Sequence, residues 1–246
     1  ARGVVRGLGL ARGGLGLVDV VSQELRTPLP GLALRAELLA GGEVPAGKER
    51  GYLKALQTEV GRLTDLVNRI LDFARLQRNR MPLERRALDA REVVARGVRA
   101  GREALKQAGQ RLAIDVPRGL PRLEADPEVL ARALRNLLEN AARYAPRGSE
   151  TALSARPDGA CLEISVADRG PGVPADERHA VFDAFYRGRN RTPSGSGLGL
   201  AIVAEAARAH GGSVAVADRP GGGAVFSLRL PLAQGGLHAQ APDRRG

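Results

Sequence analysis

The sequence predicts an α+β fold in two parts: a helical hairpin that forms a dimeric four-helix bundle, followed by an α/β sandwich. Three observations predict this arrangement. Apolar residues recur at spacings of three and four in the first part, strand-like segments alternate with helices from residue 111 onward, and polar and glycine clusters mark the second part. The 246 residues suffice for two domains of the usual size, about 100–200 residues each.

The composition excludes several classes of protein. With 43% hydrophobic and 26% charged residues, the chain is neither collagen-like nor fully disordered. No run approaches the roughly 20 apolar residues that span a bilayer, and no signal peptide opens the chain. The single cysteine excludes an internal disulfide and a Cys-rich metal site. The chain begins with Ala rather than Met, so we expect a fragment of a longer protein.

The net charge of +11 raises the question of an anionic partner. The basic residues are spread along the whole chain, and aromatic residues make up only 3% of it, too few for base-stacking platforms. We therefore interpret the arginine excess as solvated surface. We expect no nucleic-acid partner and no direct membrane contact by this fragment.

The helical hairpin follows a lead-in, residues 1–16, that is rich in Gly and expected to be flexible. Apolar periodicity predicts a helix over 17–40, a break over 41–47 and a longer helix over 48–77. We assign residues 17–78 to this first domain.

The longer helix carries a heptad seam, with apolar residues at alternating steps of three and four. Its members are Leu53, Leu56, Val60, Leu63, Val67, Ile70 and Ala74. A two-helix hairpin cannot bury this seam alone, so we predict that two copies pair into a four-helix bundle as a homodimer. Packing of the hairpin on its own second domain is the alternative.

The second domain, residues 89–232, follows a polar linker over 79–88 that contains a short extended piece. We predict helices over one face of a mixed sheet, followed by a disordered tail over 233–246. The expected helices cover 89–108, 127–144, about 174–181 and 198–210, and the expected strands cover 111–116, 151–155, 161–168, 213–218 and 224–230.

Two clusters in this domain carry polar groups suited to a nucleotide. Asn136, Asn140 and Arg143 share one face of the helix over 127–144, and Tyr144 follows them. An Asn amide oxygen suits Mg²⁺ and an Arg suits phosphate, while a Tyr ring can lie against a base. Asp168 follows a strand, so its fixed carboxylate can accept a hydrogen bond from an exocyclic amine such as that of adenine. Gly170 and Gly172 let the backbone approach a ligand closely.

A third cluster precedes the helix over 198–210. Free backbone N–H groups and the helix dipole at the start of this helix favour an anion. The residues at this position are Gly195, Gly197, Leu198 and Gly199. The polar stretch before them carries Arg187 and suits a lid that closes over polyphosphate.

The order of these clusters resembles the N, G1, F, G2 and G3 boxes of the histidine-kinase ATP-binding domain, a fold shared with type II topoisomerases, Hsp90 chaperones and MutL. The matching residues are Asn136 and Asn140, Asp168-x-Gly170-x-Gly172, Phe182-x-x-Phe185, Gly195-x-Gly197-x-Gly199, and Gly222-Gly223. The resemblance implies ATP and Mg²⁺ as cofactors, with Asn140 as the metal ligand and Asn136 beside it. It also implies Asp168 as the adenine-reading acid, Tyr144 as a wall of the adenine pocket and the second glycine group as the phosphate loop.

The hairpin carries a second resemblance. Residues 21–29, VSQELRTPL, are similar to the H-box of the dimerisation and phosphotransfer domain of sensor histidine kinases, which reads Ser-His-Glu-Leu-Arg-Thr-Pro-Leu. Gln23 stands at the position of the phosphoacceptor His. The resemblance implies that Glu24 orients the acceptor and takes its proton, and that Thr27 helps position water to dephosphorylate a response regulator. The lone pair of an amide nitrogen is delocalised, so we expect autophosphorylation to be blocked.

Three hypotheses follow. The first is the cytoplasmic transmitter region of a bacterial two-component sensor histidine kinase with a His→Gln exchange. Its parent protein would be anchored in the inner membrane, and its partner would be a response regulator. This region can retain phosphatase activity toward that regulator. The second is a natural pseudokinase that acts as an ATP-responsive binding or phosphatase module. The third is a DNA-associated ATPase of the same superfamily, which the H-box-like hairpin disfavours.

Overall fold

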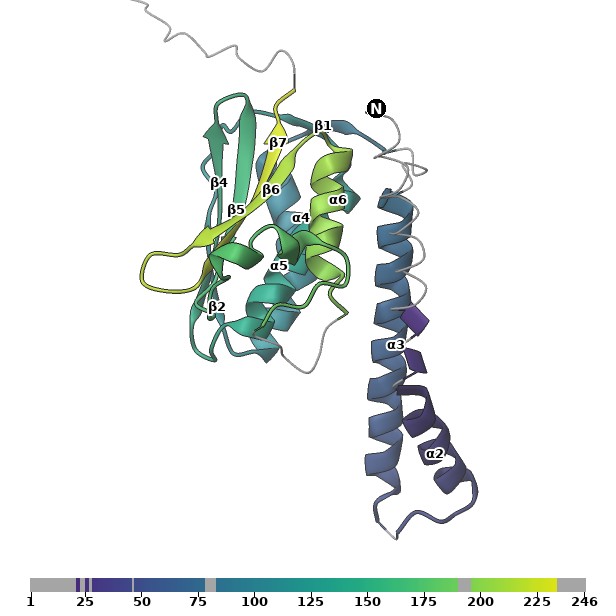
Figure 1. The fold of residues 1–246 in the computed structure, drawn as a ribbon. Coiled ribbons are helices and arrows are strands. Elements are labelled where there is room, and N and C mark those ends of the chain that lie inside the picture. Colours follow the sequence, from purple (N-terminus) through teal and green to yellow (C-terminus); the bar gives the residue numbers. More distant parts are fainter. Residues whose placement is uncertain are drawn as a thin grey trace, which may run out of the picture. The chain divides into compact units, whose positions relative to one another are not determined.

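A computed structural model describes residues 21–22, 25–26, 28–45, 47–77, 83–189 and 196–233 (Figure 1). The chain divides into two compact units, Ala1–Leu71 and Asp72–Gly246. Among the described residues, no helix combines the length and apolar character needed to cross a membrane.

The first unit contains the helical hairpin up to Leu71, and the last six residues of the hairpin's second helix belong to the second unit. Helix α2 covers Pro28–Ala40, and α3 begins at Glu49 and continues to Gln77. Gly42 and Gly47 in the connection have φ angles of 69° and 79°, a left-handed conformation that glycine adopts without strain. The predicted helix, break and longer helix are therefore present, within the residues that the structure describes.

Part of the heptad seam of α3 is exposed in the single chain, while Leu56, Leu63, Ile70 and Ala74 are part-buried. The side chains of Leu53, Val60 and Val67 are 51%, 54% and 43% exposed, although they are large and apolar. Burying such a side chain stabilises a protein by about 1.5–3 kcal/mol. The face defined by these three residues is therefore an energetically favourable place for a second helix to pack.

The second unit is built on a five-stranded mixed sheet with the strand order β2-β4-β5-β7-β6. Strand β2 pairs parallel with β4, and the remaining neighbours are antiparallel. The strands cover Arg111–Asp115 (β2), Glu150–Asp158 (β4), Cys161–Ala167 (β5), Ser213–Asp218 (β6) and Ala224–Pro231 (β7). The predicted mixed sheet is confirmed.

A second, two-stranded sheet joins β1, Arg86–Leu88, to β3, Leu123–Ala125, in antiparallel pairing. The sequence indicated the extended piece at β1 but not the strand at β3. The segment predicted as a short helix over 174–181 forms instead two short 3₁₀ helices, η1 (Ala175–Glu177) and η2 (Ala180–Phe182).

Three helices cover one face of the large sheet, as Figure 1 shows: α4 (Ala90–Gln107), α5 (Pro127–Tyr144) and α6 (Gly199–Ala209). Every second residue of β5 is buried between the layers: Leu162, Ile164 and Val166. Helices α4 and α5 approach closely, because a Cβ on Gly97 would lie only 2.5 Å from the Leu134 side chain.

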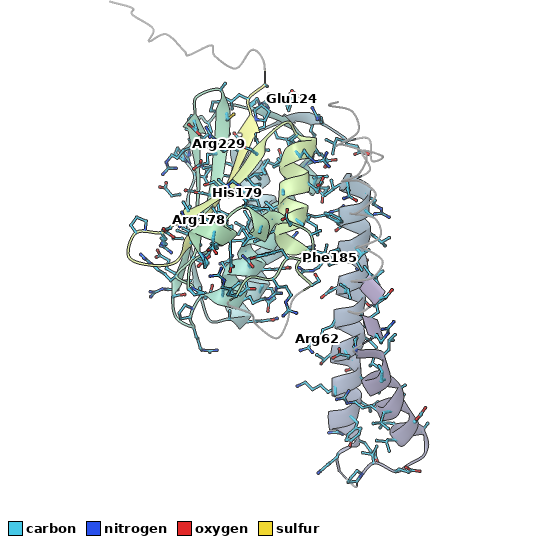
Figure 2. All side chains as sticks on the ribbon, in the orientation of Figure 1. Arg62, Glu124, Arg178, His179, Phe185 and Arg229 are labelled. Carbon is cyan, nitrogen blue, oxygen red and sulfur yellow. The ribbon has the colours of Figure 1, made fainter. Side chains whose placement is uncertain are left out.

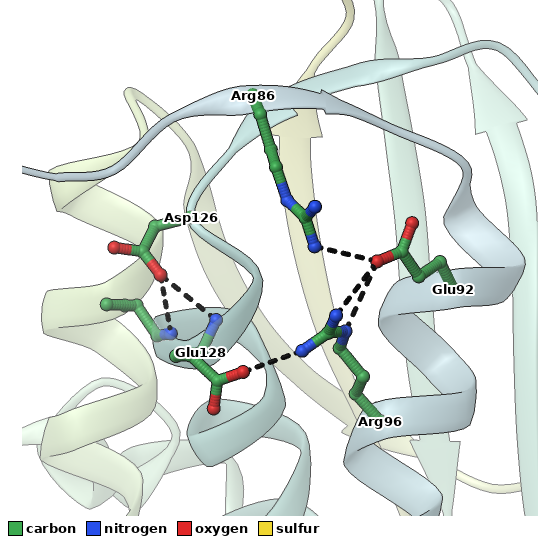
Figure 3. A network of polar contacts seen from close by, with 6 residues as sticks. Arg86, Glu92, Arg96, Asp126 and Glu128 are labelled. Atoms are coloured by element: carbon green, nitrogen blue, oxygen red, sulfur yellow. Dashed lines mark hydrogen bonds and ion pairs between the residues drawn. The ribbon is translucent and has the colours of Figure 1, made fainter.

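The helix starts are fixed by polar contacts. Asp126 caps α5 by accepting hydrogen bonds from the backbone N–H groups of Glu128 and Val129, as Figure 3 shows. Arg96 of α4 bridges to α5 through Glu128 at 2.7 Å and also donates to Glu92 of its own helix. The contact between Arg96 and Glu128 joins the second turn of α4 to the first turn of α5.

Candidate functional site

Helix α5 carries the predicted amide face. Asn136 is only 3% exposed, and its Nδ2 donates to the backbone oxygen of Arg132 at 3.0 Å. Its Oδ1 atom is buried and has no hydrogen-bond partner among the described residues. Asn140 is half-buried one turn further along the same helix. A buried amide oxygen without a partner is costly unless a ligand, water or cation satisfies it.

Asp168 lies at the end of β5 and is buried. Its backbone N–H donates to the Ala224 oxygen at 2.9 Å, and its Oδ1 accepts from the Gly170 N–H at 2.7 Å. The backbone of Gly170 therefore holds this buried carboxylate in place beside the loop after β5. Burial raises the pKa of the Asp168 carboxyl, while the hydrogen bonds of Gly170 and Ala224 and the charge of Arg219 oppose that shift.

Close backbone approaches assemble the surroundings of Asp168. A Cβ on Gly170 would lie 3.1 Å from the Tyr144 carbonyl oxygen, which brings the end of α5 against the loop after β5. A Cβ on Gly172 would lie 3.3 Å from the Gly223 carbonyl oxygen. Four sequence-predicted residues, Tyr144, Asp168, Gly170 and Gly172, are thus brought together with Gly223.

Two arginines that the sequence did not single out hold this arrangement. Arg169 donates to the Pro220 carbonyl oxygen at 2.7 Å, and Arg219 donates to the Ala167 carbonyl oxygen at 3.1 Å. Both bonds tie the β6–β7 connection to the end of β5. Their partners are backbone oxygens more than 50 residues away, so sequence spacing offers no signal for them.

The pair of phenylalanines positions the segment before α6. Phe182 packs edge-to-face on Phe226 with ring centroids 6.4 Å apart. Phe185, labelled in Figure 2, has a φ of 65°, which is rare outside glycine, and its N–H donates to the Gly197 oxygen at 3.0 Å. A Cβ on Gly197 would lie 2.7 Å from the Phe185 Cα. The two ends of the segment 186–196 are therefore held side by side.

Glu177 is a further residue that the sequence did not indicate. Its side chain is 6% exposed, it pairs with the Arg189 Nε at 3.2 Å, and it accepts from the Arg189 backbone N–H at 3.4 Å. A Cβ on Gly188 would lie 2.5 Å from its carboxylate. Glu177 thus anchors the stretch that begins with Arg187.

The start of α6 combines free donors with a buried hydroxyl. Leu198, buried, precedes the first helical residue Gly199, and no side chain caps the helix. The Ser196 Oγ is buried without a partner among the described residues. Helix α6 packs directly against α5. The uncapped N–H groups at this end suit an anion.

Some predicted site residues cannot be placed. Gln23, Glu24, Thr27 and Gly195 lie outside the described residues. Within the described part of the chain, no group of three His, Cys, Asp or Glu side chains could hold a metal ion. A Mg²⁺ ion here would instead use amide oxygens and nucleotide phosphates, which agrees with its usual coordination. The unpartnered Asn136 Oδ1 fits that donor set.

Two protein families match this chain. Residues 125–234 match the family described as histidine kinase-, DNA gyrase B- and HSP90-like ATPase. Residues 16–79 match the His kinase A (phospho-acceptor) domain. The two matches occur in the order that the hairpin and the sandwich occupy in the fold.

Known proteins resemble the chain across both parts. It is 38% identical over 215 residues to the sensor-like histidine kinase SenX3 of Mycobacterium tuberculosis, covering 86% of this chain and 52% of that protein. The structure of full-length ShkA in complex with AMPPNP aligns at a TM-score of 0.66 with 33% identity, over 89% of this chain and 46% of that one. The mycobacterial sensor histidine kinase MprB aligns at 0.52 with 31% identity, over 60% and 97%. The chain spans about half the length of SenX3.

Proposed function

This chain belongs to the sensor histidine kinases of two-component signalling, and we propose that its second unit binds ATP with Mg²⁺ at the site around Asp168. The observation that carries the proposal is the Asp168 carboxylate, which is buried and is held in place because its Oδ1 accepts from the Gly170 N–H at 2.7 Å. A rigid acceptor of this kind is suited to the exocyclic amine of adenine.

The phosphate end of the nucleotide is assigned to the start of α6 and to α5. The Gly197–Gly199 turn offers backbone donors, and Arg143 and Arg187 offer charge. Asn140, with Asn136 beside it, would hold Mg²⁺, which neutralises phosphate charge when bound. The unpartnered oxygen of Asn136 supports this assignment.

We propose that Gln23, at the phosphoacceptor position, blocks the autophosphorylation expected of this family. The nitrogen lone pair of a glutamine side chain is delocalised into its carbonyl group, so it does not attack phosphorus. Glu24 would keep the place of the acid beside the acceptor. We propose that the chain binds nucleotide without transferring its γ-phosphoryl group to itself, as a transmitter with a His→Gln exchange. A natural pseudokinase is the alternative, with the same nucleotide site.

The remaining activity assigned to the hairpin is phosphatase activity. Thr27 has a hydroxyl that can position water toward the phospho-aspartate of a response regulator, and this chemistry does not need the missing histidine.

We also propose a homodimer through the open face of Leu53, Val60 and Val67, and a cytoplasmic place for this region in a parent protein anchored in the inner membrane.

Calorimetric titration with Mg–AMP-PNP tests the nucleotide site. Asp168→Asn keeps the size of the side chain but turns one acceptor oxygen into a donor, so we expect affinity to fall by about 10- to 100-fold, as for the loss of a buried charged hydrogen bond. Asp158→Asn is the matched control, because Asp158 lies at the end of β4, half exposed, in an ion pair with Arg229. The proposal fails if the unmodified chain does not bind the nucleotide or if both variants bind it equally well.

A further inference from the structure

We propose that His210 is a positioning residue for nucleotide binding, which joins the C-terminal end of α6 to the N-terminal end of α5. The inference rests on the proposed function, because these two helices carry the residues assigned to the phosphates and to Mg²⁺. His210 itself lies at the far end of α6 from Gly199, and at the start of α5, whereas Asn136 and Asn140 lie in the middle and in the second half of α5.

The imidazole is built into the fold. His210 is 4% exposed, its Nε2 accepts from the Asp126 backbone N–H at 2.9 Å, and its Nδ1 lies 2.8 Å from the Ala206 carbonyl oxygen. The first contact requires Nε2 without a proton, and the second requires a proton on Nδ1. Only the neutral ring protonated at Nδ1 satisfies both contacts.

The partner of His210 is the residue that starts α5. Asp126 caps this helix through its Oδ1 (Figure 3), and its Oδ2 accepts from the Glu84 backbone N–H at 3.1 Å. The imidazole therefore fixes the first turn of α5 through the cap itself. Asn136 lies ten residues further along this helix, on the same rigid element.

The same point fixes the end of α6. His210 closes the helix by donating its backbone N–H to the Ala207 oxygen, while Arg85 donates to the Ala209 oxygen at 2.6 Å. Helix α6 has 11 residues, about 16 Å at 1.5 Å per residue, and begins at Gly199. Because a short helix moves as a rod, a loosened C-terminal end displaces the glycine turn relative to Asn136 and Asn140.

Burial favours the neutral ring that this geometry needs. Burial lowers the pKa of His210, and the positive charge of Arg85 lowers it further. The hydrogen bond to Ala206 and the negative charge of Asp126 act in the opposite direction. These two charged groups are Arg85, which directly precedes β1, and Asp126, the N-cap of α5.

Two variants separate positioning from simple packing. His210→Phe fills the volume but leaves the buried Asp126 N–H without an acceptor, whereas His210→Gln restores an acceptor oxygen. We expect His210→Phe to weaken Mg–AMP-PNP binding by about 5- to 30-fold, as one unsatisfied buried donor would. We expect His210→Gln to recover most of that affinity. Binding of AMP should change by less than twofold, because AMP engages mainly the Asp168 end of the site.

Hydrogen–deuterium exchange of the chain without nucleotide provides the second measurement. We expect His210→Phe to speed exchange at both distant ends, around Asn136–Asn140 and Gly199–Val203, while circular dichroism stays unchanged. The inference is wrong if faster exchange is confined to residues near 126 and 206–210, or if AMP and AMP-PNP lose affinity equally. If the unmodified chain does not bind nucleotide, the proposed function is wrong. The exchange data would still show whether His210 couples the ends of α5 and α6 to the distant glycine and asparagine positions.

Discussion

Gly223 lies against Asp168 so closely that a Cβ on the glycine would stand 2.0 Å from the Asp168 carbonyl oxygen. The φ of Gly223 is 108°, where other residues are strained. We expect Gly223→Ala to push the β6–β7 connection away from the end of β5. The free energy of unfolding should fall by about 2–5 kcal/mol, from strain and overpacking together, as measured by urea denaturation.

Gly222→Ala is the matched control for this clash. Gly222 also has a positive φ, 96°, but nothing lies within 4 Å of its would-be Cβ. Gly222→Ala should therefore lower the free energy of unfolding only by the backbone strain, about 1–3 kcal/mol, and should leave the affinity for Mg–AMP-PNP unchanged. Equal losses of stability in the two variants would contradict the close approach at Asp168.

Gln23→Asn and Gln23→His test the blocked phosphoacceptor. Incubated with radiolabelled ATP, the unmodified chain and Gln23→Asn should incorporate no acid-labile phosphate, because an amide nitrogen is a poor nucleophile. Gln23→His should become labelled, and adding Asp168→Asn should lower the labelling at subsaturating ATP, because that substitution weakens nucleotide binding. Labelling of the unmodified chain would refute the block. A Gln23→His variant that binds nucleotide but stays unlabelled would favour the pseudokinase.

Paired lysine substitutions on α3 test the homodimer. Val60→Lys with Val67→Lys places two charges on the open apolar face, and we expect sedimentation velocity to change from dimer to monomer. Thr58→Lys is the control, because Thr58 is exposed on α3 outside the heptad seam, so the dimer should persist. A monomeric unmodified chain, or a dimeric double variant, would count against the bundle.

Local sequence patterns predicted those parts of the fold that local forces determine. Alternating apolar residues predicted the strands on both sides of Pro157-Asp158-Gly159, and the structure pairs them as the β4–β5 hairpin with Asp158 opposite Cys161. Strand β3 has only three residues, and its Leu123 pairs with Leu88 far back in the chain, so no periodicity could reveal it. The 3₁₀ helices are likewise too short to establish a period.

The site was predictable for a related reason. Glycines at fixed spacing and paired asparagines leave a sequence signal, and the structure gathers Tyr144, Asp168, Gly170 and Gly172. Arg219 and His210 leave none, because their partners are 52 and 84 positions away in the chain.

Glu177 offers a fourth prediction. Glu177→Gln removes the buried charge that holds Arg189, so we expect a stability loss of about 1–2 kcal/mol and weaker Mg–AMP-PNP binding. Asp176→Asn is the control: Asp176 pairs with the same arginine at 2.5 Å, but both side chains are more than half exposed. An exposed pair contributes about 0–1 kcal/mol. Thermal denaturation and titration of both variants decide the matter, and a larger effect at Asp176 would contradict the anchoring role.

The depressed pKa of His210 predicts how stability depends on pH. Burial keeps its folded-state pKa below the ordinary histidine value of about 6.5, so the folded chain binds this proton less readily than the unfolded chain. The contribution of neutral His210 to the free energy of unfolding is complete above pH 6.5. It is lost as the pH falls toward the folded-state pKa, and the free energy of unfolding then falls by at most about 1.4 kcal/mol per pH unit. Urea denaturation between pH 7.5 and 5 should show this slope in the unmodified chain and in His179→Gln, whose histidine is exposed (Figure 2). His210→Gln should lack it, since an amide does not titrate, and an unchanged slope in that variant would show that another group is responsible.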